Sequence, residues 1–232
     1  LATFNPHHSK TCYRYGKWLT ASLYAKCEFV GVSKGDFSCK IEYAYDLPNL
    51  QDEKVHLVYE VYGDGKIIVD MSYQPVVSEI EMPVFGLIFQ LYKDMEEVNY
   101  YGFGPEENYI DRNKGALLGK YTYQVTDNLT PYLYPQECGN RTHVRELSVA
   151  GENTKLKIKG EDFEFSALHY TPYELENARH KDELPNVYQT VLCINEKQMG
   201  IAGDDTWGAK THDEFLLDKE KHHLRFSFKG KL

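Results

Sequence analysis

Apolar and polar residues alternate over long stretches of this chain. The clearest stretches are residues 54–62 and 66–73, whose apolar positions are Val55, Leu57, Tyr59 and Val61, then Ile67, Val69, Met71 and Tyr73. Because successive side chains of a strand point to opposite faces of a sheet, each stretch predicts a strand with one buried face. Gly63-Asp64-Gly65 between them is typical of a turn. We therefore predict a β-hairpin over residues 54–73.

Similar patterns recur along most of the chain. Further strands are predicted at residues 23–32, 38–45, 85–91, 98–101, 121–125, 144–149, 155–159, 162–168, 188–194, 214–217 and 222–228. Short polar turns separate these segments, so we expect an all-β fold of antiparallel sheets packed face to face. No internal repeat and no linker rich in Pro, Gly or Ser interrupts the series. We therefore expect one domain over residues 1–232.

One segment predicts a helix. Thr171 offers a capping hydroxyl, Pro172 fits the first helical position, and Glu174 can reach back to the cap. This capping box precedes residues 175–180. We expect a single short helix near residues 172–180.

Charge and cysteine content limit the classes of partner. The sequence has 35 acidic and 26 basic side chains, a net charge of −9 that is spread along the chain. This balance offers no basic surface for nucleic acid or for an anionic membrane, and we expect neither as a partner. The five cysteines form no CxxC pair, which predicts reduced thiols and a cytoplasmic protein. Since residue 1 is Leu, we also expect the chain to be a piece of a longer protein.

The sequence shows no self-contained catalytic motif. It lacks a GxSxG nucleophile turn, a phosphate-binding GxxxxGK[ST] loop and an HExxH metal motif. The neighbouring histidines in His7-His8 and His222-His223 would project to opposite faces of a strand, so we expect no metal site. Tyrosine is abundant, with 19 residues, which suits both the core of a β-sandwich and a surface that binds sugar rings.

Carboxylates gather in three loops that glycine and proline interrupt. Glycoside hydrolysis needs two such groups on opposite sides of the scissile bond. The candidates are Glu106, Glu107, Asp111, Glu137, Asp204 and Asp205. Aspartates in a glycine-flanked turn usually accept backbone N–H bonds, and we expect this structural role for Asp204 and Asp205. We expect Arg112 to pair with Asp111 or Glu106 and so to hold the first loop.

Taken together, the three loops resemble a known family. Residues 102–112 read GFGPEENYIDR, residues 135–145 read PQECGNRTHVR, and residues 200–207 read GIAGDDTW. In this order the motifs are similar to those of the C-terminal domain of family 2 beta-galactosidases, which is also the small subunit of two-chain enzymes. The resemblance covers about residues 82–228, and residues 1–80 are compatible with it. Ala202, Thr206 and Cys138 depart from the family pattern.

The resemblance implies both a fold and a role. The fold is a large antiparallel supersandwich like that of galactose mutarotases. Trp207 is the expected substrate-binding residue, an indole face on which the aglycone side of a galactoside stacks. The expected supporting residues of the loops are Asp204, Asp205, Glu106, Asp111, Arg112, Glu137 and Arg145.

The same resemblance places the chemistry elsewhere. In this family the catalytic glutamates and the magnesium ligands belong to a TIM-barrel domain, which nothing in this sequence matches. We therefore expect no catalytic residue, cofactor or metal in this chain, and inactivity when it is alone. Its expected partners are the barrel-bearing domain or subunit, in an oligomeric enzyme that hydrolyses terminal beta-galactosides such as lactose with retention of configuration.

Two other functions remain open from the sequence. The chain can be an autonomous carbohydrate-binding module whose tyrosines and Trp207 line a groove. Alternatively, it can be a mutarotase-like sugar epimerase, which needs a histidine and a carboxylate facing each other. His180 and Glu137 are the pair we would assign to that reaction.

Overall fold

Within the residues that the structure describes, the fold consists of antiparallel strands, a short helix and a few isolated helical turns. The computed structural model describes residues 16, 18, 21–48, 54–75, 81–205, 207, 209–217 and 221–231. Its strands are β1 (Lys26–Lys34), β2 (Ser38–Asp46), β3 (Val55–Tyr62), β4 (Ile67–Tyr73), β5 (Val84–Tyr92), β6 (Glu97–Gly104), β7 (Leu117–Gln124), β8 (Arg141–Ala150), β9 (Lys155–Leu168), β10 (Gln189–Gln198) and β11 (His222–Lys231). The helix is α2 (Pro172–Asn177). The all-β class is confirmed.

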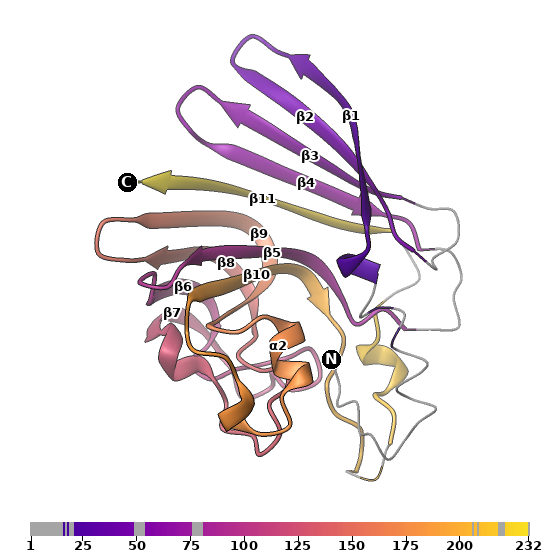
Figure 1. The fold of residues 1–232 in the computed structure, drawn as a ribbon, viewed down its shortest axis with the longest axis vertical. Coiled ribbons are helices and arrows are strands. Elements are labelled where there is room, and N and C mark those ends of the chain that lie inside the picture. Colours follow the sequence, from indigo (N-terminus) through magenta and orange to yellow (C-terminus); the bar gives the residue numbers. More distant parts are fainter. Residues whose placement is uncertain are drawn as a thin grey trace.

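All the strands belong to one 11-stranded sheet, in which the order runs β1-β2-β3-β4-β11-β9-β8-β6-β7 and β5 joins through β10. The predicted hairpin is confirmed, since β3 pairs antiparallel with β4 and Leu57 lies opposite Met71. We expected separate antiparallel sheets packed face to face; the face-to-face packing is present, but the two packed parts belong to one connected sheet. In Figure 1, β1–β4 spread across the upper part of the molecule, while α2 lies in the lower part.

Strand β9 explains how one sheet packs against itself. Its first half pairs with β11 as far as Gly160, and its second half pairs with β10 from Glu164 onward. On its other side, the ladder with β8 shifts register twice between Arg141 and Glu146. Such bulges bend a strand and increase its twist. The sheet therefore divides at β9, and β5 and β10 turn back over β4 and β11.

Aromatic side chains fill the space between the two parts of the sheet. Phe89 of β5 makes edge contacts with Phe226 and Phe228 of β11, at ring-centroid distances of 6.2 and 5.8 Å. Phe85 stacks on Tyr73 of β4 at 6.3 Å. Edge-to-face and offset pairs of this kind add to the stability that comes from burial alone. The alternating apolar positions seen in the sequence thus form one continuous core.

Three boundary predictions are wrong. Residues 155–159 and 162–168 form the single strand β9, because the change of partner at its middle leaves the backbone extended. Residues 214–217 were predicted as a strand, but the first two lie in the 3-10 helix η3 (Asp213–Phe215) and the last two form no strand. The Leu216 N–H donates to the Asp213 carbonyl and closes this turn. A helical turn at residues 21–23 occupies the start of the first predicted strand.

The helix begins as predicted and ends early. The Thr171 hydroxyl accepts the Glu174 N–H at 3.1 Å, and the Glu174 carboxylate accepts the Thr171 N–H at 2.8 Å. This capping box satisfies two backbone donors that no carbonyl of the helix can reach. The helix ends at Asn177, three residues before His180. Beyond it, Ala178 has extended backbone angles.

A buried glutamate joins three strands beneath the loops. The Glu164 side chain on β9 is 6% exposed, and its Oε2 accepts the Asn140 amide at 3.0 Å and the Gln198 N–H at 3.1 Å. Burial raises its pKa to about 8, although both hydrogen bonds act in the opposite direction. The carboxyl is therefore largely neutral at pH 7.

This raised pKa predicts a pH dependence of stability. The folded chain binds the Glu164 proton more tightly than the unfolded chain, so the free energy of unfolding falls as pH rises from the ordinary carboxyl pKa toward 8. The fall is at most about 1.4 kcal/mol per pH unit for one proton. A Glu164→Gln variant keeps an acceptor oxygen and cannot ionise. It should lose this slope in urea unfolding measured between pH 5 and pH 9.

Glu161→Gln is the matched control, because Glu161 lies on the same strand and is exposed. The control variant should keep the slope of the parent chain. A Glu164→Gln variant with an unchanged slope would show that Glu164 ionises normally in the fold.

Candidate functional site

The stretch that carries Trp207 is a loop closed at its base. It leaves β10 and returns to η3, where the Gly200 N–H donates to the Phe215 carbonyl at 2.8 Å and the Thr211 hydroxyl donates to the Gly200 carbonyl at 3.1 Å. A Cβ on Gly200 would lie 2.8 Å from the Asp111 carboxyl carbon, and one on Gly203 would lie 2.3 Å from the Ala209 carbonyl oxygen. These two glycines are required by close packing. Ala202 is exposed, so its methyl group is tolerated.

The two aspartates of this loop have different partners. Asp205 Oδ1 accepts the Trp207 N–H at 2.7 Å and the Ala209 N–H at 3.4 Å, so it holds the backbone of the turn. The Asp204 carboxylate lies 2.8 Å from His212 Nε2 and makes a side-chain pair instead of a backbone bond. Hydrogen bonding and charge from Asp204 raise the pKa of His212.

Trp207 itself is open to solvent. Its side chain is 87% exposed, the highest value among the tyrosine and tryptophan residues that remain exposed in the described chain. An exposed large aromatic side chain on a loop with a held backbone is typical of a binding surface. The indole is therefore available as a flat apolar face.

Asp111 connects the first loop to the Trp207 loop. Its Oδ2 accepts the Ala202 N–H at 2.9 Å. Because Gly200 packs directly on the same carboxyl group, the two loops touch over several atoms. The first and third motifs of the sequence therefore lie side by side, although 91 residues separate Asp111 from Ala202.

Glu107 connects the first loop to the second. Its carboxylate accepts the Gly139 N–H at 2.6 Å, the Thr130 hydroxyl at 2.9 Å, and the Tyr132 hydroxyl at 3.1 Å. Arg112 also binds it, at 2.5 Å. Our expectation that Arg112 pairs with Asp111 or Glu106 is therefore wrong. Burial acts to raise the pKa of Glu107, but the Gly139, Thr130 and Arg112 contacts outweigh it and leave the pKa lowered.

A buried polar layer lies under these loops. The Asn108 Oδ1 accepts both the N–H and the hydroxyl of Thr142, and the Asn108 N–H donates to the Asn140 carbonyl. Arg141 is 5% exposed, and its guanidinium donates to two side chains, the Tyr100 hydroxyl and the Asn128 amide oxygen. It also donates to the backbone carbonyls of Pro105, Gly139 and Asn140. The sequence did not single out these residues for a role, because a buried asparagine or arginine has no distinctive spacing.

Two expected supporting residues lie apart from the Trp207 loop. Arg145 donates to the His143 carbonyl at 2.9 Å and lies over the Tyr101 ring, at 5.9 Å from its centroid. The Glu106 side chain is exposed and faces a hollow beside Tyr121 and Asp127. Neither side chain bonds to a described residue of the Trp207 loop.

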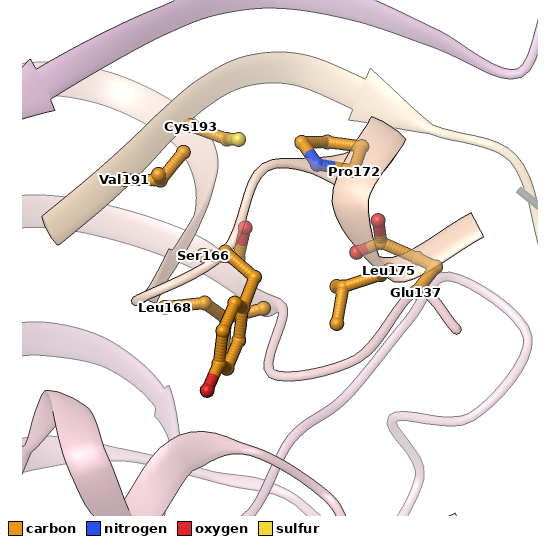
Figure 2. A pocket seen from close by; sticks show the side chains of 8 residues that line it. Glu137, Ser166, Leu168, Pro172, Leu175, Val191 and Cys193 are labelled. Carbon is orange, nitrogen blue, oxygen red and sulfur yellow. The ribbon is translucent and has the colours of Figure 1, made fainter. Parts of the chain in front are cut away.

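Glu137 lies in a narrow cleft between α2 and β10. Figure 2 shows its carboxylate beside Leu175, with Val191 and Cys193 on the strand across from it. The cleft is too narrow to admit a water molecule. Burial raises the pKa of the Glu137 carboxyl. In the part of the chain that the structure describes, no hydrogen bond or ion pair joins Glu137 to His180, whose ring lies 5.9 Å from Tyr134. The geometry therefore gives no support to the epimerase.

Within the residues that the structure describes, no group of three His, Cys, Asp or Glu side chains is arranged to hold a metal ion. Cys27, Cys39, Cys138 and Cys193 are free thiols, and Cys12 and His7-His8 lie outside the described residues. No described helix has the length and apolar character needed to cross a bilayer.

Known proteins similar to this chain are beta-galactosidases. The enzyme from Streptococcus thermophilus is 39% identical over 213 residues, which are 90% of this chain and 21% of that protein. The enzyme from Halalkalibacterium halodurans is 38% identical over 232 residues, 97% of this chain and 23% of that protein. The chain thus spans about a fifth of the length of these curated relatives.

The chain is also similar to a solved structure and matches a family model. A GalM/aldose epimerase homologue from C. elegans matches 90% of this chain and 69% of its own, with a TM-score of 0.46 and 11% sequence identity. The family model described as beta galactosidase small chain matches residues 4–229, so it includes the N-terminal segment that the three loop motifs leave out. The chain therefore belongs to the beta-galactosidase small chain family.

Proposed function

We propose that this chain completes the galactoside-binding pocket of a TIM-barrel catalytic domain that lies outside the sequence, in an enzyme that hydrolyses terminal beta-galactosides. The observation that carries the proposal is the exposed Trp207 indole on a loop held by Asp205 and Asp111. A rigid aromatic face suits the C–H groups of a sugar ring. The names of the relatives support galactosides as the substrate class.

The carboxylates of this chain are poorly placed for the chemical step. Glu107 is occupied by four donors, Asp111 binds the loop backbone, and Glu137 lies in a cleft that excludes water. We therefore assign both catalytic carboxylates to the barrel part. One protonates the leaving oxygen, and the other forms a covalent galactosyl intermediate, which water or a sugar acceptor then takes with net retention of configuration.

The proposed enzyme has its cofactor and partners outside this chain. Following the resemblance to family 2 beta-galactosidases, we assign the magnesium ligands to the barrel part as well. The four described cysteines are free thiols, which suits a cytoplasmic enzyme. Trp207 would then contact the aglycone or an acceptor sugar, and it would influence the balance between hydrolysis and transfer.

The isolated chain should have no galactosidase activity. Purified chain should not hydrolyse nitrophenyl beta-galactoside, because we assign both catalytic carboxylates to the barrel part of the enzyme. Joining it to the barrel-bearing part of the enzyme should restore hydrolysis. A turnover rate that rises in proportion to the concentration of the isolated chain would contradict the assignment.

The second prediction concerns the indole. In the assembled enzyme, Trp207→Ala should weaken aglycone binding by about 1–3 kcal/mol, by analogy with nucleic-acid bases that stack on aromatic side chains. Trp207→Phe keeps a flat ring and should lose less. The measurement is the Kd or KM for galactosides with large and small aglycones. Equal values for the parent enzyme and Trp207→Ala would show that the aglycone does not stack on Trp207.

The third prediction concerns the carboxylate that holds the loop. Asp205→Ala removes the acceptor of the Trp207 N–H and should reproduce part of the Trp207→Ala effect, whereas Asp205→Asn keeps an acceptor oxygen and should stay close to the parent. In a Trp207→Ala background, Asp205→Ala should add little, because both changes act through one contact. Asp213→Ala, at an exposed aspartate of η3, is the matched control. Independent and additive losses would contradict a role exerted through Trp207.

A further inference from the structure

A second hollow on this domain lies away from the Trp207 loop. It has a volume of about 250 Å³ and opens between the end of β6, strand β7 and the 3-10 helix η1 (Val125–Asn128). In Figure 1, β7 lies on the left of the molecule, while the chain that follows β10 descends at the lower right. None of the described hydrogen bonds of the Trp207 loop involves β7 or η1. The two surfaces are therefore separate.

The walls of this hollow combine aromatic rings with free carboxylates. Tyr121 and Tyr123 alternate on β7 and so share one face of the strand. Glu106 and Asp127 are both exposed at the rim, and neither side chain bonds to any other described residue. Four carboxylate oxygens are thus available to accept hydrogen bonds from a ligand.

The floor carries a buried positive charge. Arg141 lines the hollow, and all the acceptors of its hydrogen bonds are neutral: the Tyr100 hydroxyl, three backbone carbonyls and the Asn128 amide. Its Nη2 donates to Asn128 and to no other described group. The guanidinium lies 5.2 Å from the centroid of the Tyr123 ring, which supplies a weak cation–π contact instead of a counter-ion.

These charges restrict the class of ligand. A cation entering the hollow would meet the guanidinium at its floor, and an anion would meet the two carboxylates at its rim. A neutral polyhydroxylated ring avoids both repulsions, because each hydroxyl can donate to a carboxylate and accept from a guanidinium N–H. The C–H face of such a ring also suits a tyrosine side chain. The volume is below the usual range for drug-sized ligands and fits one sugar ring.

We propose that the hollow between β7 and η1 is a monosaccharide-binding site, with Glu106 and Asp127 as acceptors, Tyr121 and Tyr123 as stacking faces, and Arg141 as a donor at its floor. The site is independent of the aglycone surface at Trp207. It would hold a free hexose, such as the product of galactoside hydrolysis, on the surface of the domain.

Titration of the full chain with D-galactose and D-glucose tests this proposal. Binding is followed by backbone amide chemical shifts, and saturable changes should centre on residues 121–128. Trp207→Ala should leave these changes intact, which separates this site from the proposed aglycone surface. Glu106→Gln and Asp127→Asn should each weaken binding at least about tenfold, since each removes a charged acceptor. These side chains make no bonds within the described fold, so the variants should remain folded, as the spread of amide shifts will show.

Glu152→Gln is the matched control, because Glu152 is exposed in the turn between β8 and β9. Small charged probes, methylammonium and sulfate, should give no saturable shifts at residues 121–128. The proposal is overturned if no hexose saturates these shifts, if Asp127→Asn and Glu106→Gln bind like the parent, or if a charged probe binds there in place of the sugars. Loss of sugar binding in Trp207→Ala alone would instead assign it to the aglycone surface.

Discussion

Four donors converge on the Glu107 carboxylate, and the arrangement of the three motif loops depends on this group. Gly139 belongs to the second loop, Thr130 and Tyr132 lie in the segment just before it, and Arg112 belongs to the same loop as Glu107. A carboxylate that accepts several bonds is stabilised in its charged form, which agrees with its lowered pKa. Glu107 therefore holds the first loop in two ways, through Arg112 within the loop and through Gly139 of the second loop. Asp111, next to Arg112, carries this order to the loop of Trp207.

The loops rest on a layer of buried polar side chains. Removing one partner of a buried donor or acceptor costs roughly 1–3 kcal/mol, so such a layer is stable only when nearly every group is bonded. Asn108, Arg141 and Glu164 meet this condition through bonds that cross β8, β9 and the end of β10, whereas Asn140 bonds through its amide N–H but leaves its Oδ1 without a partner. The branch of the sheet at β9 brings these strands together. The layer therefore couples the curvature of the sheet to the placement of the loops.

The two surfaces that we assign to sugars use the same chemistry in different ways. At Trp207 the aromatic face is exposed and the carboxylates nearby are occupied by the backbone or by His212. At the hollow beside β7, the carboxylates have no partner among the described residues and the aromatic rings are partly buried. An open face needs a second wall from another domain to enclose a ligand. The hollow supplies its own walls.

Much of this protein is determined by the sequence alone. Alternation of apolar residues located the strands, and the Thr171-Pro172-Tyr173-Glu174 segment located the helix, because both signals are local and depend on side-chain period and capping. The motifs located the three loops. The tertiary structure alone decided that Arg112 pairs with Glu107, that β9 is one strand with two partners, and that residues 213–215 form a 3-10 turn. Each of these depends on groups brought close by the curvature of the sheet, and sequence spacing carries no information about such distances.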